Sequence, residues 1–432
     1  MMLQESSWII MNDLLTAEND LPDASKSLRP AARPWRRWSR AFDFHNFSTN
    51  VAFTNAIWMI YLAGHGYNAL ELGLLEMLFH LAKFATELPT GIFADILGRR
   101  KSLIIYCAIL SFESLLFLVP TPPLIILSFV LAGTAYAFRG GSSEALLWHI
   151  AGRADPTRQA GRYSQLVSRM YLVALLGEII GTISGGYLHT ILTILPFVAR
   201  GLFTLLGIIP LLFLPEQQVT ASERTSPLLH LSKSMRIVWR SPALVGLLLI
   251  SGLVDGCWQT IYYFYQLYLH GQNFSTVLIG IIVALSTVTG FLFTALAPQV
   301  MRWLKESWLI PLFVLSQMLG LALMSLPQAG LSLFGYLVCF QAAVSVLDPA
   351  ISTYINQRLP EAQRATVLSL QTGLFSAVMI VLFPLFGLSV TTIPYSTVYL
   401  WTLLALITGA LGIGLLVLWL RKQGQKHVEE EA

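Results

Sequence analysis

The segment "ELPTGIFADILGRRKSL", residues 87–103, lies between two long apolar runs. It combines a glutamate, two glycines, an aspartate and three consecutive cations in one short junction. A polar break between apolar segments is usually a solvated turn, and such a turn needs no particular combination of residues. The meaning of this segment therefore depends on the chain that flanks it.

The composition is that of a membrane protein. Of 432 residues, 55% are hydrophobic and only 12% are charged, and the mean hydropathy is +0.66. A soluble domain carries about 25% charged residues. Runs of about 20 apolar residues, enough to cross a bilayer core of about 30 Å, recur along the chain. The three cysteines (Cys107, Cys257 and Cys339) lie inside such runs and predict packing, with no disulfide framework and no metal site.

The apolar runs predict an all-α polytopic protein with twelve transmembrane helices. They lie at about 42–64, 68–93, 102–120, 122–150, 164–190, 192–215, 241–269, 275–298, 307–326, 328–357, 364–389 and 394–420. Connections after the odd-numbered spans contain no lysine or arginine, whereas those after the even-numbered spans are cationic. Cationic connections stay in the cytoplasm. We expect a multi-pass protein of the cell (plasma) membrane with both termini cytoplasmic.

The longest polar connection separates two groups of six spans. The expected organisation is a cytoplasmic tail (1–40), a six-helix bundle (41–215), a cytoplasmic central loop (216–240), a second six-helix bundle (241–421) and a cytoplasmic tail (422–432). A faint repeat at an offset of 204 residues aligns Glu144 with Asp348, although chance similarity between apolar helices is the alternative. Two parallel halves are typical of transporters that rock around a site at the membrane midplane.

The N-terminal region predicts an anchor. Residues 1–28 are polar, show no cleavable signal peptide and predict a disordered tail. Residues 29–40, "RPAARPWRRWSR", carry five arginines and two tryptophans before the first span. Anchoring at lipid headgroups is favoured over a nucleic-acid patch, so membrane lipids are expected partners and nucleic acid is not.

With this topology, the opening segment lies in the cytoplasmic turn between spans 2 and 3. It resembles the signature loop of the major facilitator superfamily, G-x-x-x-D-x-x-G-R-R/K, with Gly91, Asp95, Gly98, Arg99 and Arg100 in its places. Twelve spans in two halves fit the same family. Glycines at the turn would let another helix approach closely, and Asp95 is placed to accept from a helix N-terminus or to pair with Arg99.

The resemblance implies that this loop helps to hold the cytoplasmic gate closed. Its expected partner is "QRATVLSL", residues 363–370, at the start of span 11. The alternative is that the three cations only anchor the topology. A gating motif says little about the substrate.

A second resemblance lies in span 5. "GEIIGTISGG" matches the glycine spacing associated with proton-driven drug antiporters of this superfamily, with Gly177, Gly181, Gly185 and Gly186 in place and Thr182 where that motif has proline. Close packing of helices through small residues is the alternative.

The chain also looks like a bacterial subgroup of efflux-like facilitators. The segments that carry this likeness are the opening one, "EALL" in span 4 and "NQRLPEAQRATVLSL" between spans 10 and 11. Arg139 departs from the subgroup. It resembles the span-4 arginine linked to proton transfer in related antiporters, although the residues after it match that motif poorly.

Span 2 carries a charged face. Glu76, His80, Lys83 and Glu87 fall within an arc of about 60° on one helix. Such a stripe is untenable against lipid, so it predicts either ion-pair packing against a neighbouring helix or a path for protons or substrate.

Other ionisable residues fall within predicted spans, where each is a candidate for function. The proton-coupling candidates are Asp255, Glu144, Glu178, Asp348, Arg139, Lys83, His80 and Glu87. Static salt bridges between helices are the alternative for each. Glu113 is expected toward the outer side and peripheral.

The resemblance implies that spans 1, 4, 7 and 10 line the cavity, which makes Asp255, Trp258, Gln259 and Tyr262 the substrate-cavity candidates. Tyr262–Tyr268 otherwise reads as an interfacial aromatic belt.

These patterns predict a secondary active transporter. No phosphate-binding loop, nucleophile elbow or zinc pattern is visible, so neither enzyme activity nor a cofactor is expected, and an ion gradient is the expected energy source. The leading interpretation is proton-coupled export of a hydrophobic or amphipathic small molecule by a monomer. The alternatives are proton-coupled uptake of a polar solute, a lipid flippase, or a non-transporting sensor on the same scaffold.

Overall fold

The computed structural model describes residues 32–154, 158–215, 235, 238–239, 241–359 and 361–431. Within these ranges the chain is helical and contains no strand. Eight of the described helices are long and apolar enough to cross a membrane. The all-α membrane fold is confirmed, and the count of twelve spans stays a prediction. The predicted N-terminal tail up to residue 31 and nearly all of the central loop lie outside the described residues.

The chain divides into two compact units. The first contains Met1–Thr220 together with Tyr263–Val288, and the second contains Ala221–Tyr262 together with Thr289–Ala432. Two helices therefore contribute to both units: α12 (Pro242–Gly271) and α13 (Thr276–Trp303).

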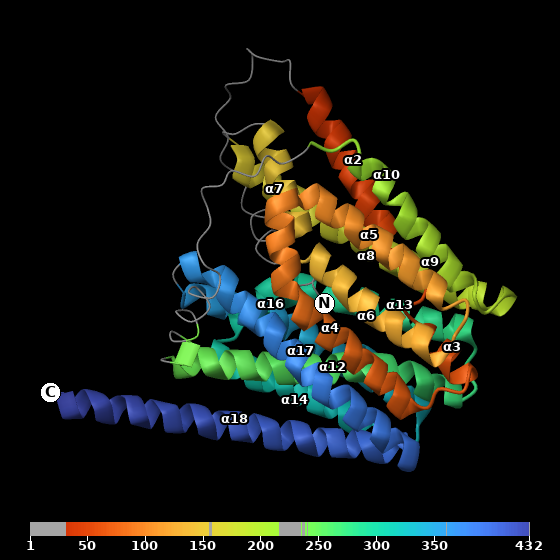
Figure 1. The fold of residues 1–432 in the computed structure, drawn as a ribbon. Coiled ribbons are helices and arrows are strands. Elements are labelled where there is room, and N and C mark those ends of the chain that lie inside the picture. The colour runs from red at the N-terminus through yellow and green to blue at the C-terminus, as the bar shows by residue number, and fades with distance from the viewer. Residues whose placement is uncertain are drawn as a thin grey trace. The chain divides into compact units, whose positions relative to one another are not determined.

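The first unit is built from helices that pack side by side (Figure 1). They are α2 (Ala32–Asn50), α3 (Trp58–Gly64), α4 (Ala69–Leu97), α5 (Arg99–Leu116), α6 (Pro122–Arg139), α7 (Ser142–Ala154), α8 (Gln159–Ile191), α9 (Leu195–Leu206) and α10 (Ile208–Leu211). Helix α6 packs against α4 and α5, α9 packs against α5, and α2 packs against α8. A capping box starts α4, because the Asn68 side chain accepts from the Glu71 amide while the Glu71 carboxylate accepts from the Asn68 amide.

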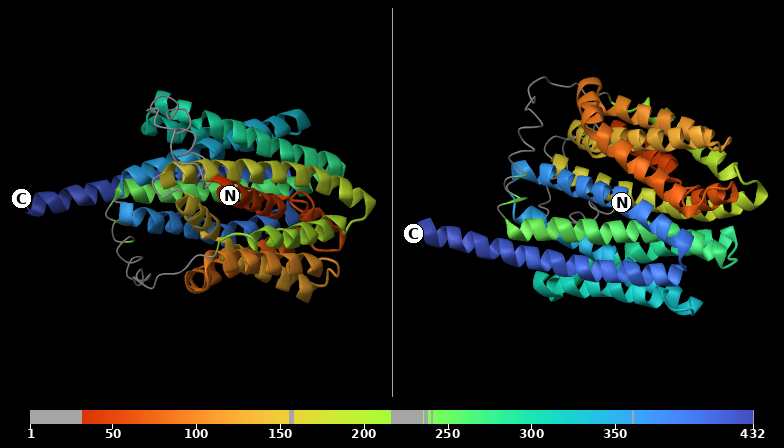
Figure 2. Two further views of the ribbon diagram at one scale, coloured as in Figure 1. Left: turned by 90° about the horizontal axis from the view of Figure 1, so that it is seen from above. Right: turned by 60° about the horizontal axis from the view of Figure 1, so that its bottom comes forward.

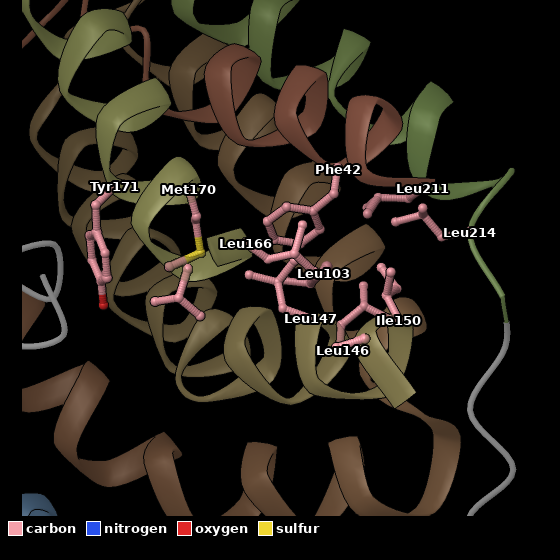
Figure 3. Packing of buried hydrophobic residues seen from close by; sticks show 12 residues of the cluster. Phe42, Leu103, Leu146, Leu147, Ile150, Leu166, Met170, Tyr171, Leu211 and Leu214 are labelled. Carbon is pink, nitrogen blue, oxygen red and sulfur yellow. The ribbon is translucent and has the colours of Figure 1, made fainter. Parts of the chain in front are cut away.

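An apolar cluster joins several helices of this unit. Phe42 of α2, Leu103 of α5, Leu147 of α7 and Leu166 of α8 converge in it (Figure 3). Each is almost fully buried. The packing explains why the short helix α7, with only 13 residues, is held in place.

Two predicted spans are interrupted. The first is helical to Asn50 and again from Trp58, with a non-helical stretch at 51–57 between. The fourth breaks after Arg139, where Gly141 takes φ +66°, a conformation that favours glycine. A hydropathy pattern cannot show either break, because the apolar run continues through both.

The second unit contains the remaining helices. They are the first part of α12, the second part of α13, α14 (Glu306–Met324), α15 (Ala329–Phe334), the π-helix η3 (Gly335–Phe340), α16 (Gln341–Gln357), α17 (Glu361–Thr392) and α18 (Tyr395–Glu431). Helix α14 packs against η3, α16 and α18, and Figure 2 shows α18 running alongside α14. The predicted tenth span is thus one α–π–α run, and π-helical turns are frequent at functional sites.

Candidate functional site

Two aspartates meet in the second unit. Asp255 of α12 and Asp348 of α16 are 2% and 5% exposed, and their side chains lie within interaction distance of each other. Two neighbouring carboxyl groups can form a hydrogen bond only when one of them carries a proton, because an ionised carboxylate only accepts. The pair is therefore a candidate site for one proton between two helices.

Neighbouring polar side chains hold this carboxyl pair in place. The Ser251 hydroxyl, one helical turn before Asp255, donates to Asp255 Oδ2 at 2.9 Å. Gln371 Nε2 of α17 donates to the same hydroxyl oxygen at 2.8 Å. Hydrogen bonds through the Ser251 hydroxyl thus link α17 to Asp255 of α12.

A proline next to Asp348 leaves one backbone carbonyl of α16 without its helical hydrogen bond. Pro349 lies inside α16 and has no N–H to give to the Ser345 carbonyl one turn earlier. Thr294 Oγ1 of α13 donates to that carbonyl at 3.2 Å instead. The carbonyl that proline leaves without a helical partner is therefore satisfied from a neighbouring helix, as an apolar environment demands.

The cavity candidates lie on the same helix as Asp255. Trp258 Nε1 donates to Gln341 Oε1 at 2.9 Å, and the rings of Trp258 and Tyr262 are 5.2 Å apart. Gln259 is partly buried. Tyr262 and Tyr265 are buried, so the interpretation of this run as an interfacial aromatic belt is wrong for these two residues.

In the first unit, Arg139 ends α6. Its Nη2 donates to Asn50 Oδ1 at 3.1 Å, and its guanidinium lies 5.6 Å from the centre of the Tyr106 ring. Glu144, in the first turn of α7, is partly exposed and acts on Arg139 through its charge. These two residues are neighbours without being an ion pair.

Glu113 is not peripheral, contrary to the expectation. It is 3% exposed, and its Oε2 lies 3.6 Å from Arg200 Nη2 of α9. Arg200 Nη1 also donates to the Thr54 hydroxyl at 3.2 Å. The pairing joins residues 87 positions apart, and no spacing in the sequence indicates it.

We predict that Arg200→Gln destabilises the protein by about 3–5 kcal/mol, because it leaves the Glu113 carboxylate buried without its cation. Glu113→Gln/Arg200→Gln removes both charges and should recover most of this loss. Thermal unfolding in detergent measures both. Equal stability of the single and double variants would contradict the pairing.

The charged face of α4 divides along its length. Glu76 and His80 are buried, with Oε2 and Nε2 4.0 Å apart. Lys83 and Glu87 are partly exposed and interact through their charges. Acidic and basic side chains of α4 therefore pair with each other along the same helix. The role of this face in a proton path stays a prediction.

The signature loop forms the junction of α4 and α5. Gly98 takes φ +96° and ψ +148°, which lets one helix end and the next begin at the same residue. Asp95 and Arg99 form an ion pair across this junction, and Arg100 Nη1 donates to the Leu214 carbonyl at 2.8 Å. A Cβ on Gly91 would meet nothing within 4 Å, so no helix among the described residues approaches it closely. Most side chains of the expected partner, 363–370, lie outside the described ones.

We predict that Gly98→Ala lowers the free energy of unfolding by about 1–3 kcal/mol, since a Cβ strains this backbone conformation. Gly91→Ala is the matched control, because it has open space and a helical backbone. Thermal unfolding distinguishes the two. A Gly98→Ala variant as stable as the control would contradict the strained junction.

The glycines of span 5 face two different segments. A Cβ on Gly177 would lie 3.2 Å from the Asn50 carbonyl, and those on Gly181 and Gly185 would clash with the backbone of Ala52 and Phe53. A Cβ on Gly186 would lie 2.5 Å from the Thr276 carbonyl of α13. The glycine motif therefore allows the non-helical part of span 1 to pack closely against α8. Its link to antiport stays a prediction.

Glu178 follows the first of these glycines on α8. It is partly buried, and Thr287 Oγ1 donates to its Oε1 at 3.3 Å. Across the described residues, no three histidine, cysteine, aspartate or glutamate side chains are placed to hold a metal ion.

The described residues form helical units of a membrane protein with buried polar groups between the helices. A family model described as Major Facilitator Superfamily matches residues 44–384, so the chain belongs to this superfamily. Secondary transport by alternating access is the activity of such a chain. This confirms the family predicted from the signature loop.

Individual relatives are distant. An uncharacterized MFS-type transporter of Bacillus subtilis (strain 168), YxaM, is 23% identical over 345 residues, which cover 76% of this chain and 84% of that protein. The crystal structure of the nucleoside transporter NupG matches with a TM-score of 0.69 at 15% identity, covering 89% of this chain and 99% of the solved one. A bacterial homolog of the human lysosomal transporter Spinster, inward-facing and unoccupied, matches with a TM-score of 0.68 at 15% identity, covering 93% and 99%. These structures establish the fold alone.

Proposed function

We propose that the protein exports a hydrophobic or amphipathic small molecule in exchange for protons. The observation that carries this proposal is the Asp255–Asp348 pair, in which two buried carboxyl groups from different helices interact. In the proposed mechanism the pair shares one proton, because two neighbouring negative charges are not tolerated in a poorly hydrated site. Deprotonation must therefore change the packing of α12 against α16 or draw in a cation.

This coupling links one proton to one conformational change. With the proton bound, the pair is compact and the second unit keeps the packing described above. When the proton leaves, repulsion between the carboxylates favours a different arrangement of the same helices. A substrate with different affinities for the two arrangements is then coupled to the proton, because any ligand shifts such an equilibrium only through its differential affinity.

The side chains around the pair support an apolar substrate with some polar character. Trp258 and Tyr262 supply aromatic surface one and two turns along α12. The amides of Gln317, Gln341 and Gln371 are buried in the same unit and favour the second candidate, proton-coupled uptake of a polar solute. All three amides are engaged within the protein, because Gln317 Nε2 donates to the Val254 carbonyl, Gln371 Nε2 donates to Ser251, and Gln341 Oε1 accepts from Trp258 Nε1.

Transport in both directions distinguishes the candidates. Proteoliposomes are screened with lipophilic cations, neutral lipophiles, anionic amphiphiles and nucleosides, with the pH gradient imposed in each direction. Export by antiport predicts that a lipophile accumulates in vesicles whose lumen is acidic. Accumulation of a nucleoside driven by an inward proton gradient, with no lipophile moved, would support uptake and overturn export.

We also propose that the protein lies in the cell membrane with both termini cytoplasmic. Reporters fused after "PTPP" (120–123) or "HGQNFS" (270–275) are expected outside, and those fused after residue 101 or 240 inside, because the odd-numbered connections lack cations. Alkaline phosphatase and green fluorescent protein fusions measure this. A reversed or eleven-span pattern would contradict the two-half organisation.

A further inference from the structure

Two guanidinium groups of the first unit have different partners. Arg200 is neutralised by the carboxylate of Glu113 at 3.6 Å. Among the described residues, the partners of Arg139 at hydrogen-bond distance are neutral: the Asn50 amide oxygen at 3.1 Å and the Tyr106 hydroxyl at 3.5 Å. No described carboxylate is in direct contact with Arg139, and a cation of this kind within a membrane span is costly enough to indicate function.

The neutral partners of Arg139 are themselves fixed. Asn50 Nδ2 donates to the Asn46 carbonyl at 2.7 Å and to Asn46 Oδ1 at 3.0 Å, so the Asn50 amide oxygen is left for the guanidinium. Asn46 Nδ2 in turn donates to the Met170 carbonyl of α8 at 2.6 Å. The guanidinium is held in position before any ligand arrives, and such preorganisation lowers the cost of binding.

The guanidinium of Arg139 has more donors than its two neutral partners use. A guanidinium carries five N–H groups, and the structure uses two of its nitrogens for the partners named above. The residue is partly exposed. Glu144 is close enough to Arg139 to interact with it electrostatically. The free donors match the planar, two-oxygen edge of a carboxylate or a phosphate.

A row of neighbouring aromatic side chains begins at the guanidinium of Arg139. The ring of Tyr106, which faces Arg139, lies 5.8 Å from that of Tyr136, and Tyr136 lies 5.6 Å from Phe79. Tyr136 and Phe79 are only partly buried. A fixed cation therefore adjoins an apolar aromatic surface, which suits a molecule with an anionic group on an apolar body.

We propose that Arg139 binds the anionic group, a carboxylate or phosphate, of an amphipathic ligand whose apolar part lies along Tyr136 and Phe79. This inference rests on the proposed function in taking the ligand to be the transported amphiphile. The assignment gives Arg139 a binding role in place of the proton-transfer role expected from its position in span 4.

Binding of matched probes tests the assignment. Thermal unfolding of the purified protein in dodecyl maltoside is followed with decyl phosphate, decanol and decyltrimethylammonium. The wild type is expected to bind decyl phosphate best, and Arg139→Gln to bind it about 10- to 100-fold more weakly, with decanol binding unchanged. Arg139→Lys keeps the positive charge but loses the planar guanidinium with its paired donors. This variant should retain part of the preference for decyl phosphate.

The matched control is Glu113→Gln/Arg200→Gln, which removes the other guanidinium together with its partner and should keep the wild-type preference. Unfolding of each variant without ligand verifies that it is folded. Equal binding of decyl phosphate and decanol by the wild type would overturn the proposal. So would an anion preference that survives in Arg139→Gln.

The same measurement in nanodiscs separates two sources of the anionic group. Competition by phosphatidylglycerol supports a lipid headgroup, and undiminished decyl phosphate binding supports a free amphiphile. Failure of this inference is distinguishable from failure of the proposed function. Proton-driven export of neutral lipophiles without any anion preference would overturn only the anion-binding role of Arg139. Anion binding without any proton-driven flux would overturn only the proposed function.

Discussion

Replacement of both Asp255 and Asp348 by asparagine is expected to abolish transport driven by a pH gradient while substrate exchange without a gradient continues. In the proposed mechanism, these two buried carboxyl groups share one proton. Amides of the same shape cannot gain or lose that proton. A typical coupling free energy of about 1–3 kcal/mol corresponds to a change of about 5- to 150-fold in affinity between protonation states, and this dependence should vanish.

The single variants sharpen this prediction. In Asp255→Asn or Asp348→Asn, the amide N–H is able to donate to the remaining carboxylate and so imitates the protonated pair. Each single variant should therefore fold, exchange substrate and fail to respond to pH. Glu306→Gln is the matched control, because Glu306 pairs with Arg358 in the same unit, away from the carboxyl pair. Full gradient-driven transport by the double variant would exclude this site as the coupling site.

Substitution of the span-5 glycines is expected to lower the stability of the protein strongly. In Gly181→Ala and Gly185→Ala, the new methyl group would overlap the backbone of residues 51–53, which cannot rotate away as a side chain would. Overpacking costs about 1–3 kcal/mol even where side chains yield, so each variant should lose at least that much, and the double variant should yield little monodisperse protein.

Gly161→Ala provides the matched control for these two variants. Gly161 lies on the same helix, α8, and a Cβ there would meet nothing within 4 Å. Alanine also favours helix by about 1 kcal/mol over glycine, so this variant should be as stable as the wild type or more stable. Size-exclusion profiles and thermal unfolding measure the difference. Wild-type stability of Gly185→Ala would contradict the close contact between α8 and span 1.

The all-α membrane fold was predictable because it depends on properties that act along the chain. Apolar runs predict helices wherever a bilayer must be crossed, and the signature loop identified the family from five residues. The breaks at 51–57 and after Arg139 were not predictable in this way. They depend on what packs beside the chain, as Gly181 and Gly185 show, and on the single backbone conformation of Gly141.

The candidate site was predictable as a set of residues but not as a set of contacts. Asp255 and Asp348 stood out because acids are rare in apolar runs, yet their interaction joins residues 93 positions apart. Glu113 was misplaced for the same reason, since its partner Arg200 lies on a different helix. Asn46 and Asn50 carry no charge and gave no signal, although they position Arg139.

Proton movement driven by substrate tests the central claim most directly. Vesicles carrying the reconstituted protein and an internal pH dye are loaded with a lipophile found in the transport screen and diluted into substrate-free buffer at the same pH. Because coupling is reciprocal, outward flow of the substrate should draw protons inward and acidify the lumen. Asp255→Asn/Asp348→Asn should show substrate flow with no change in pH. Substrate flow without acidification in the wild type, or equal acidification in the double variant, would contradict proton-coupled export through this pair.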